Sequence, residues 1–259
     1  MSKHPFHLVS CSPWPFFSSL SLLLLLSGFL LLLGSGNLSC LVLGLASTFL
    51  CFLSWFKDII IEGTHLGFHT RIVTRGLRLG FLLFLVSEVF LFLAFFWAYL
   101  HSSLSPSVEI GSYWPPAGIT PISYTTIPLL NTILLLSSRM TVTWAHSCLL
   151  HSDLHSSFRL LCFTIVVGLM FAGFQIYEYH SSSFCISDSV YGSSFYMATG
   201  LHGLHVFFGS LFILVSCTRL YLGHFNSEVH HCFLFSAWYW HFVDVIWLLL
   251  FGVLYCWGS

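Results

Sequence analysis

The chain has 259 residues, of which 57% are hydrophobic and only 7% carry a formal charge. About a quarter of the residues of a soluble domain are charged, so this composition indicates a membrane protein. The net charge of −1 argues against a nucleic acid as a partner. The nine cysteines stand singly with no C-x-x-C pair, which suits neither a zinc site nor a disulfide framework.

Seven stretches are long and apolar enough to cross a membrane, because a bilayer core about 30 Å thick needs roughly 20 apolar residues in a helix. In chain order they cover residues 16–34, 38–56, 77–100, 128–150, 158–180, 193–222 and 233–257. Every backbone polar group in a span must be bonded within the span, so we expect helices. The predicted fold class is all-α, a polytopic membrane protein with seven transmembrane helices.

Seven spans place the two termini on opposite sides of the membrane. The N-terminus and the loops after spans two, four and six then share one side, and these segments hold nearly all the basic residues: Lys3, Lys57, Arg71, Arg75, Arg78, Arg159 and Arg219. Basic residues concentrate on the inner side of a membrane. We therefore expect the N-terminus to face the cytoplasm or the mitochondrial matrix.

Loop lengths divide the chain into three parts. A very short turn at residues 34–37 makes spans one and two an antiparallel hairpin, within residues 1–60. A polar loop on the inner side is predicted at residues 61–76, and a five-helix bundle at residues 77–259. The length of this loop suggests that the hairpin stands apart from the bundle.

One acid, Glu88, falls near the middle of the third span. Its own helical face holds only phenylalanines and leucines, so no donor for a carboxylate comes from that helix. Ionisable groups at this depth are costly and are candidates for function. Two interpretations stand side by side: a protonated carboxyl without a special role, and a proton-relay group.

Two pairs of ionisable residues have helical spacing. His202 and His205 lie three residues apart in the sixth span, and His241 and Asp244 repeat this spacing in the seventh. The pattern suits either hydrogen bonds between helices or ligands for a metal or haem. Three glycines of the sixth span are expected to let a neighbouring helix approach closely: Gly200, Gly203 and Gly209.

A cation, Arg139, lies near the centre of the fourth span. A buried guanidinium stays charged and needs a carboxylate or several carbonyls. Glu88 and Asp244 lie at a similar predicted depth. We expect Arg139 to pair with an acid or to make a polar contact with another subunit.

Aromatic residues near the span ends are interpreted as interface belts. They are Trp97, Tyr99, Trp114, Tyr177, Tyr179, Trp238, Tyr239, Trp240, Tyr255 and Trp257.

Eight segments, in the same order and across nearly the whole chain, match one known family. They are "SPWPF" at 12–16, "HLGFHTRIVTRGLRLG" at 65–80, "SEVFLFLAFFWAYLHSSLSP" at 87–106, "WPPAGI" at 114–119, "PLLNTILLLSS" at 128–138, "TWAHS" at 143–147, "ISDSVYGSSFYMATGLHGLHVFFGS" at 186–210 and "WYWHFVDVIWLL" at 238–249. With these segments the chain resembles subunit III of cytochrome c oxidase, the haem–copper terminal oxidase. The last two segments are the most specific.

The resemblance implies a two-helix hairpin and a five-helix bundle around a lipid-filled, V-shaped cleft. It implies a subunit without a redox centre, catalytic residue or metal of its own, in a complex that passes electrons from cytochrome c to oxygen and pumps protons. Haem a and copper would belong to subunits I and II, the partners together with accessory subunits and membrane lipids. The implied place is the mitochondrial inner membrane, with the N-terminus in the matrix and the C-terminus in the intermembrane space.

The resemblance also implies roles for single residues. Glu88 matches the family's carbodiimide-reactive membrane carboxylate, with a role in proton uptake into subunit I. Five positions resemble those that line the phospholipid cleft: Trp55, Glu62, His69, Arg78 and Arg219. The two arginines are suited to phosphate headgroups. His202, His205, His241 and Asp244 become a buried polar network rather than haem ligands.

The sequence also departs from the family. Arg139 stands where the family has a small residue, which suggests a lineage-specific contact, and Ile61 replaces a basic residue before Glu62. Two other functions are alternatives to the oxidase subunit. A membrane haem protein would use His202, His205 and His241 as ligands, and a secondary transporter would couple protons through Glu88 but would show internal repeats, which are not seen.

Overall fold

The computed structural model describes residues 6–258, which form two compact units that divide between Leu79 and Gly80. Seven α-helices occur in these residues, which confirms the all-α, seven-helix prediction. They are α1 (Trp14–Ser35), α2 (Ser39–Thr64), α3 (Arg71–Leu104), α4 (Ile127–Leu150), α5 (Leu154–Ser181), α6 (Ser189–Tyr221) and α7 (His231–Leu250). A short 3-10 helix, η1 (Val108–Ile110), precedes α4, and a π-helical segment, η2 (Phe251–Cys256), continues α7.

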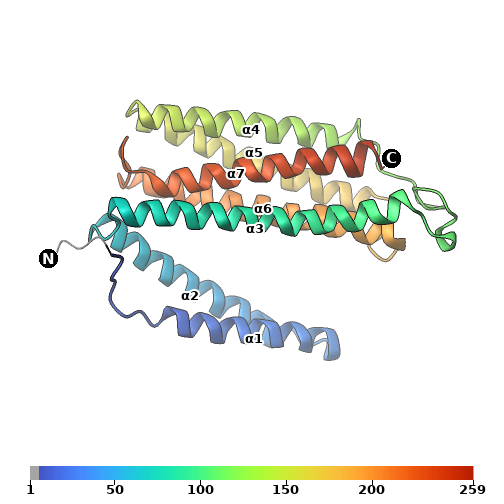
Figure 1. Ribbon diagram of the computed structural model, residues 1–259, viewed down its shortest axis with the longest axis horizontal. Helices are drawn as coiled ribbons and strands as arrows, with labels where there is room; N and C mark the ends of the chain where they lie inside the picture. Colours follow the sequence, from blue (N-terminus) through green and yellow to red (C-terminus); the bar gives the residue numbers. More distant parts are fainter. Residues whose placement is uncertain (1–5, 259) are drawn as a thin grey trace. The chain divides into compact units, whose positions relative to one another are not determined.

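Helices α1 and α2 form an antiparallel hairpin in the first unit, drawn in blue in Figure 1. Gly36 ends α1 with φ 71°, and its N–H bonds to the carbonyl of Leu32. Only a residue without Cβ adopts this left-handed conformation readily. Asn37 then accepts the N–H of Ser39 at 2.9 Å, which starts α2. The expected hairpin turn lies at the predicted place.

The two helices of this hairpin approach each other at two glycines. A Cβ on Gly28 would lie 2.5 Å from the backbone nitrogen of Leu41, and one on Gly44 would lie 2.5 Å from the Cα of Leu25. Small residues permit such close backbone contact between membrane helices. At the other end of the hairpin, the indole N–H of Trp14 donates to Asp58 of α2 at 2.5 Å.

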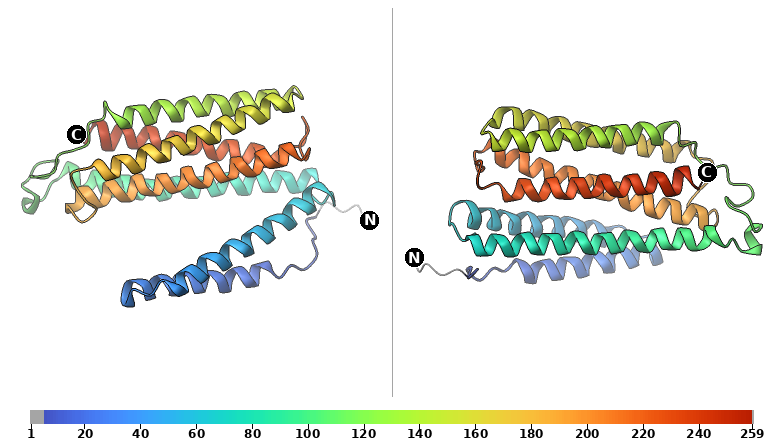
Figure 2. Two further views of the ribbon diagram at one scale, coloured as in Figure 1. Left: turned by 180° about the vertical axis from the view of Figure 1, so that it is seen from behind. Right: turned by 45° about the horizontal axis from the view of Figure 1, so that its top comes forward.

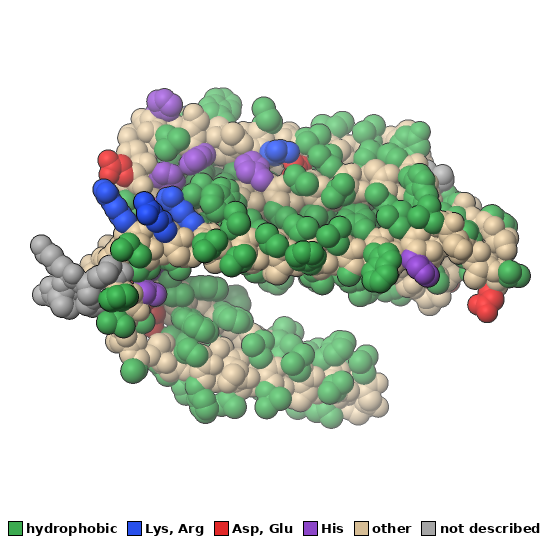
Figure 3. Space-filling model, in the orientation of Figure 1, with side chains coloured by type: hydrophobic (Ala, Val, Ile, Leu, Met, Phe, Trp, Pro, Cys, Tyr) green, Lys and Arg blue, Asp and Glu red, His purple; other side chains and the backbone are tan. Residues whose placement is uncertain are grey.

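The interval 61–76, expected to be a loop, is mostly helical. Helix α2 continues to Thr64 and α3 already begins at Arg71, so only residues 65–70 connect them. Polar residues can continue a helix past the apolar core of a bilayer, which is why the hydropathy boundary and the helix boundary differ. Lys and Arg side chains gather near the start of α3 in Figure 3.

In the second unit, α4, α5, α6 and α7 pack in a ring of neighbours, α4 on α5, α5 on α6, α6 on α7 and α7 on α4. Figure 2 shows these four helices lying nearly parallel, together with α3. Helix α3 adds aromatic contacts, such as the stacking of Phe81 on Phe235 with centroids 4.8 Å apart.

Several aromatic residues interpreted as belt residues belong instead to the core of this unit. Tyr99, Tyr255, Trp240 and Tyr239 are buried, whereas Trp97 and Tyr177 are exposed. Aromatic side chains also pack helices together, and their sequence positions do not distinguish the two uses. The belt interpretation was therefore wrong for the buried members.

The glycines of α6 also divide into two kinds. A Cβ on Gly209 would lie 3.0 Å from the indole of Trp240, whereas one on Gly203 would meet nothing within 4 Å. At Gly200 the nearest atom would be the hydroxyl of Tyr179 at 4.0 Å. Only Gly209 makes the close approach that was predicted for all three.

Six of the helices described are long and apolar enough to cross a membrane, the exception being α4. Helix α4 has 24 residues, a length of about 36 Å that is ample for crossing. Its polar residues, including Asn131 and Arg139, lower its hydropathy. The chain is thus a polytopic membrane protein. The V-shaped cleft between hairpin and bundle stays a prediction.

Candidate functional site

Glu88 of α3 is paired with His205 of α6. Oε2 of Glu88 lies 2.8 Å from Nε2 of His205. Their side chains are 18% and 11% exposed, so both are largely buried in this unit. No hydrogen-bond donor for the Glu88 carboxyl comes from α3 itself, as the sequence indicated. The partner, His205, comes from α6.

The other nitrogen of His205 determines what this pair can do. Nδ1 lies 2.8 Å from the carbonyl oxygen of Leu201. A carbonyl can only accept, so Nδ1 carries a hydrogen. The remaining nitrogen and the carboxyl then share one proton, as Glu–COOH with neutral imidazole or as carboxylate with imidazolium. The pair is thus a hydrogen bond between two ionisable side chains in largely apolar surroundings.

An apolar groove of about 450 Å³ leads to this pair. Besides Glu88 and His205, its lining is almost wholly hydrocarbon: Phe81, Phe84, Leu91, Phe208, Phe212 and Tyr239. The ring of Tyr239 stacks on His205 with centroids 6.2 Å apart. Such a groove suits an acyl chain or a small apolar molecule, with the ionisable pair at its wall.

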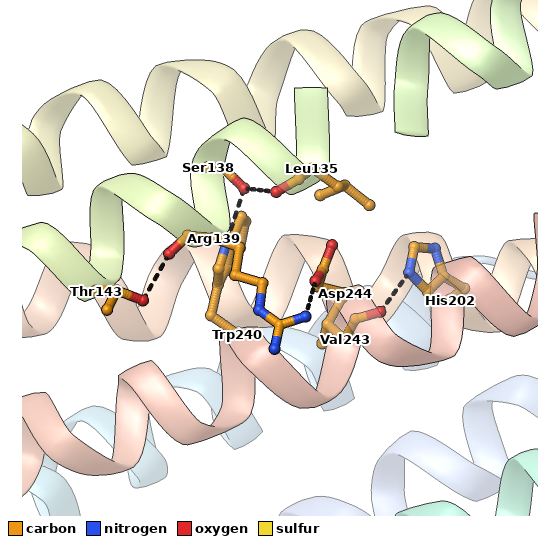
Figure 4. A network of polar contacts seen from close by, with 8 residues as sticks. All are labelled: Leu135, Ser138, Arg139, Thr143, His202, Trp240, Val243 and Asp244. Carbon is orange, nitrogen blue, oxygen red and sulfur yellow. Dashed lines mark hydrogen bonds and ion pairs between the residues drawn. The ribbon is translucent and has the colours of Figure 1, made fainter. Parts of the chain in front are cut away.

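Arg139 of α4 pairs with Asp244 of α7, so it meets an acid as expected (Figure 4). Nη1 of Arg139 lies 3.2 Å from Oδ2 of Asp244. The aspartate is fully buried, but the arginine side chain is 42% exposed in this chain, so it is only half-buried. One turn before Asp244, the indole of Trp240 donates to Ser138 at 2.9 Å. The indole of Trp247 also donates to Thr132 at 3.0 Å, so three polar contacts join α7 to α4.

The four residues predicted to form one polar network make separate contacts. Nε2 of His202 donates to the carbonyl of Val243 at 3.2 Å, as Figure 4 shows. His205 binds Glu88, and Asp244 binds Arg139. Nδ1 of His241 has no hydrogen-bond partner among the described residues. No hydrogen bond of the described residues joins two of these four side chains directly, and the single network stays a prediction.

The five lipid-site candidates divide between the two units. Trp55 and Glu62 lie on α2, His69 lies in the segment before α3, and Arg78 lies in the first turns of α3. Arg219 belongs to the second unit, near the end of α6, with its guanidinium carbon 4.8 Å from the ring centre of Phe225. Their joint role in binding lipid stays a prediction.

Reasoning from the sequence missed Glu178 on α5. This acid is 2% exposed, and the hydroxyl of Tyr255 donates to its Oε1 at 2.6 Å. Gln175, one turn earlier, donates to the same oxygen at 3.2 Å. The signal that could have found it is a Gln and a Glu at helical spacing near the end of an apolar span.

These features define a polytopic α-helical membrane protein with ionisable pairs inside its helix bundle. In the part of the chain that the structure describes, no cluster of three His, Cys, Asp or Glu residues is placed to hold a metal ion. The sequence matches the family model for cytochrome c oxidase subunit III over residues 4–259. The chain belongs to this family.

Individual members of the family are similar to this chain over almost its full length. Cytochrome c oxidase subunit 3 of Tachyglossus aculeatus aculeatus is 48% identical over 256 residues, which are 99% of this chain and 98% of the relative. The subunit of Struthio camelus is 49% identical over 256 residues, with the same coverage. That of Pisaster ochraceus is 49% identical over 257 residues, 99% of each chain.

Proposed function

We propose that this chain is the non-redox core subunit III of a mitochondrial cytochrome c oxidase. It supports subunits I and II, which hold haem a and copper, and it retains phospholipids and sustains proton uptake into subunit I. The membership in the subunit III family supports this assignment. Basic residues such as Lys57, Arg75 and Arg159 lie near the helix ends that face the matrix in the proposed orientation.

The observation that carries the proton role is the bond between Glu88 and His205. Within an apolar groove, this pair accepts one proton and keeps it between Oε2 and Nε2. A carboxylate alone in hydrocarbon would be costly, and the imidazole offsets that cost. The pair thus forms a proton store beside the lipid-facing surface, from which a proton can be passed on toward subunit I.

The groove supports the lipid role. Its aromatic and aliphatic lining suits an acyl chain, and the half-buried Arg219 and exposed Arg78 suit a phosphate headgroup. An acyl chain in the groove would exclude water from the Glu88–His205 pair. The same lining would admit oxygen, which prefers an apolar phase.

The test compares turnover by the purified intact oxidase in wild type and Glu88→Gln. Glutamine keeps the size of the side chain but cannot give up a proton, so activity is expected to decay faster over successive turnovers. His205→Gln should have the same effect. Glu109→Gln, which changes an exposed acid of η1, serves as the matched control. Decay at the wild-type rate in both site variants would refute the proton role.

The haem-protein alternative is disfavoured by the histidine contacts. Both ring nitrogens of His205 and Nε2 of His202 already make hydrogen bonds. A visible spectrum of the separated chain decides the question, because a haem band stoichiometric with this chain would overturn the oxidase-subunit proposal.

A further inference from the structure

Glu178 is a second buried carboxyl of the bundle, at the end of α5 opposite to Arg159. Both of its protein donors, Tyr255 of η2 and Gln175 of α5, bond to one oxygen, Oε1. The other oxygen, Oε2, is buried and has no hydrogen-bond partner in the described residues. Glu88 differs, because its Oε2 is bonded to a histidine.

In the described residues, no cation forms an ion pair with Glu178. The ion pairs of the described residues are Arg139 with Asp244 and His205 with Glu88, and neither involves it. The titratable groups that face it are the phenols of Tyr255 from η2 and Tyr179 from its own helix. Neither phenol supplies a positive charge, and an uncompensated buried carboxylate is strongly disfavoured.

The hydrogen bonds indicate which oxygen carries the acidic proton. Because Oε1 accepts two donors, the proton belongs on Oε2, where it needs an acceptor. The neighbouring Gln175 also has an oxygen, Oε1, that is buried and lacks a partner in the described residues, as does the side-chain amide of Asn131 on α4. Buried polar atoms that lack a protein partner are the usual sites of ordered water.

A cavity of about 310 Å³ with several hydroxyl groups in its lining lies beside this group, at the helix ends. Glu178 lies in its lining, together with Thr120, Pro121, Ile122, Thr126, Ile127 and Ser181 to Ser183. Thr120, Thr126 and Ser183 are exposed, so the mouth opens at the end of the helices while Glu178 is at the buried end. The hydroxyls of Thr120 and Ser183 are bonded across that mouth. Asn131 lies one turn along α4 from Ile127.

The mouth lies at the end of the unit where α5 ends, α4 begins and the C-terminus is found (Figure 1). This is the end opposite to Arg159 at the start of α5. The volume is sufficient for several water molecules with hydroxyl partners.

We propose that Glu178 is a proton-exchange site reached by water through this cavity. A hydronium ion in the cavity gives its proton to Oε2 and leaves as water, and the reverse step returns the proton to the aqueous phase at the α5 end. The site is independent of the Glu88 pair, since the two carboxyls face different cavities, one polar and one apolar. Tyr255 and Gln175 occupy Oε1, so Oε2 is the oxygen left to exchange the proton.

The first test is chemical labelling of the intact, detergent-purified complex with a water-soluble carbodiimide and glycine amide, read by peptide mass spectrometry. Label is expected on Glu178 and on the exposed Glu109, but not on Glu88, whose groove is apolar. Ser183→Phe should fill the mouth and abolish the label on Glu178. Ser187→Phe, at an exposed serine outside the cavity lining, should leave it unchanged.

The second test is infrared spectroscopy of the wild type, with Glu178→Gln as the reference. A protonated-acid C=O band that shifts in D2O and is missing from the variant supports the proposal. Absence of label together with an unshifted band would mean a sealed carboxyl and would overturn it. Protection from the label by Na⁺ but not by choline would also overturn it, because the site would then bind a cation. If Glu178→Gln does not assemble, two measurements still test whether Glu178 exchanges protons with water. They are the deuterium shift of the wild type and the labelling of Ser183→Phe.

Discussion

Arg139 and Asp244 join the middle of α4 to the middle of α7, with 3.2 Å between Nη1 and Oδ2. The aspartate is completely buried, whereas the arginine side chain is 42% exposed in the isolated chain. The charge that pays the larger desolvation cost is therefore the acid, and the arginine is its counter-ion. Oδ1 of Asp244 has no partner among the described residues, so this carboxylate depends on Arg139.

Arg139→Leu should destabilise the bundle. It leaves Asp244 buried without a counter-ion, and we expect a loss of about 3 kcal/mol, at the low end for a broken buried pair because the arginine is half-exposed. The loss would be measured as a lower thermal midpoint of the purified complex. Arg159→Leu, which removes an exposed arginine, is the matched control.

The double variant Arg139→Leu with Asp244→Leu sharpens this test. Replacing both charges by apolar side chains should recover most of the lost stability, since no buried charge remains. A double variant as unstable as the single one would contradict the ion-pair explanation.

The close approach of α5 and α6 to Trp240 predicts that two glycines of the bundle tolerate no larger residue. A Cβ on Gly168 would lie 2.8 Å from Cη2 of Trp240, and one on Gly209 would lie 3.0 Å from Cε3. Gly168→Ala and Gly209→Ala should each cost about 1–3 kcal/mol, measured by chemical denaturation of the complex. Gly203→Ala, with open space at its Cβ, should be neutral or slightly stabilising. Equal losses at Gly203 and Gly209 would argue against this packing.

The hairpin should respond in the same way at its own contact points. Gly28→Ala and Gly44→Ala place a methyl group against backbone atoms of the facing helix, which cannot move aside as a side chain can. We expect each substitution to destabilise the hairpin by about 1–3 kcal/mol. The measurement is the fraction of sodium dodecyl sulfate in the detergent at which the subunit unfolds, which should be lower than in the wild type. Gly34→Ala, where a Cβ meets nothing within 4 Å, is the control. If none of the three substitutions lowers the stability, the two helices are not packed through Gly28 and Gly44.

Asp153 should make the start of α5 sensitive to acid. Its carboxylate caps the helix by accepting the N–H of Ser156 at 3.1 Å. Hydrogen bonds from the side chain and then the backbone of Ser156 hold the pKa of Asp153 below its ordinary value. A depressed folded pKa means that the stabilisation is complete above the unfolded pKa and is lost as the pH falls through the folded value.

Hydrogen exchange of the amides at 155–158 can measure this cap. The ratio of exchange rates between Asp153→Ala and wild type should be large at pH 7 and should fall toward one in acid. Asparagine caps without a titrating charge, so the ratio of exchange rates between Asp153→Ala and Asp153→Asn should not vary with pH. A pH-independent ratio for Asp153→Ala would refute the charged cap.

Much of this architecture could be predicted from the sequence because the bilayer imposes a strong rule on it. Apolar runs of sufficient length had to be helices, and seven were found near the predicted places. The hairpin turn followed from the glycines and Asn37. The ends of α2 and α3 were predicted less well, because hydropathy reports the bilayer core and not the polar turns that extend helices beyond it.

The candidate site was only partly predictable. An arginine in an apolar span needs a partner, so the sequence required an acid for Arg139, with Glu88 and Asp244 as the options. Helix packing decided between them. Helix α4 lies on α7 and so meets Asp244, while His205 of α6 reaches Glu88.

By itself, then, the sequence determined the number of helices, the family and the ionisable residues placed in apolar surroundings. These follow from composition, local spacing and motif order along the chain. Only the tertiary structure decided which charges meet, which glycines carry a contact and that Glu178 faces a polar cavity. Those features depend on the rotation of each helix about its axis, which is set by the side chains of neighbouring helices far away in the sequence.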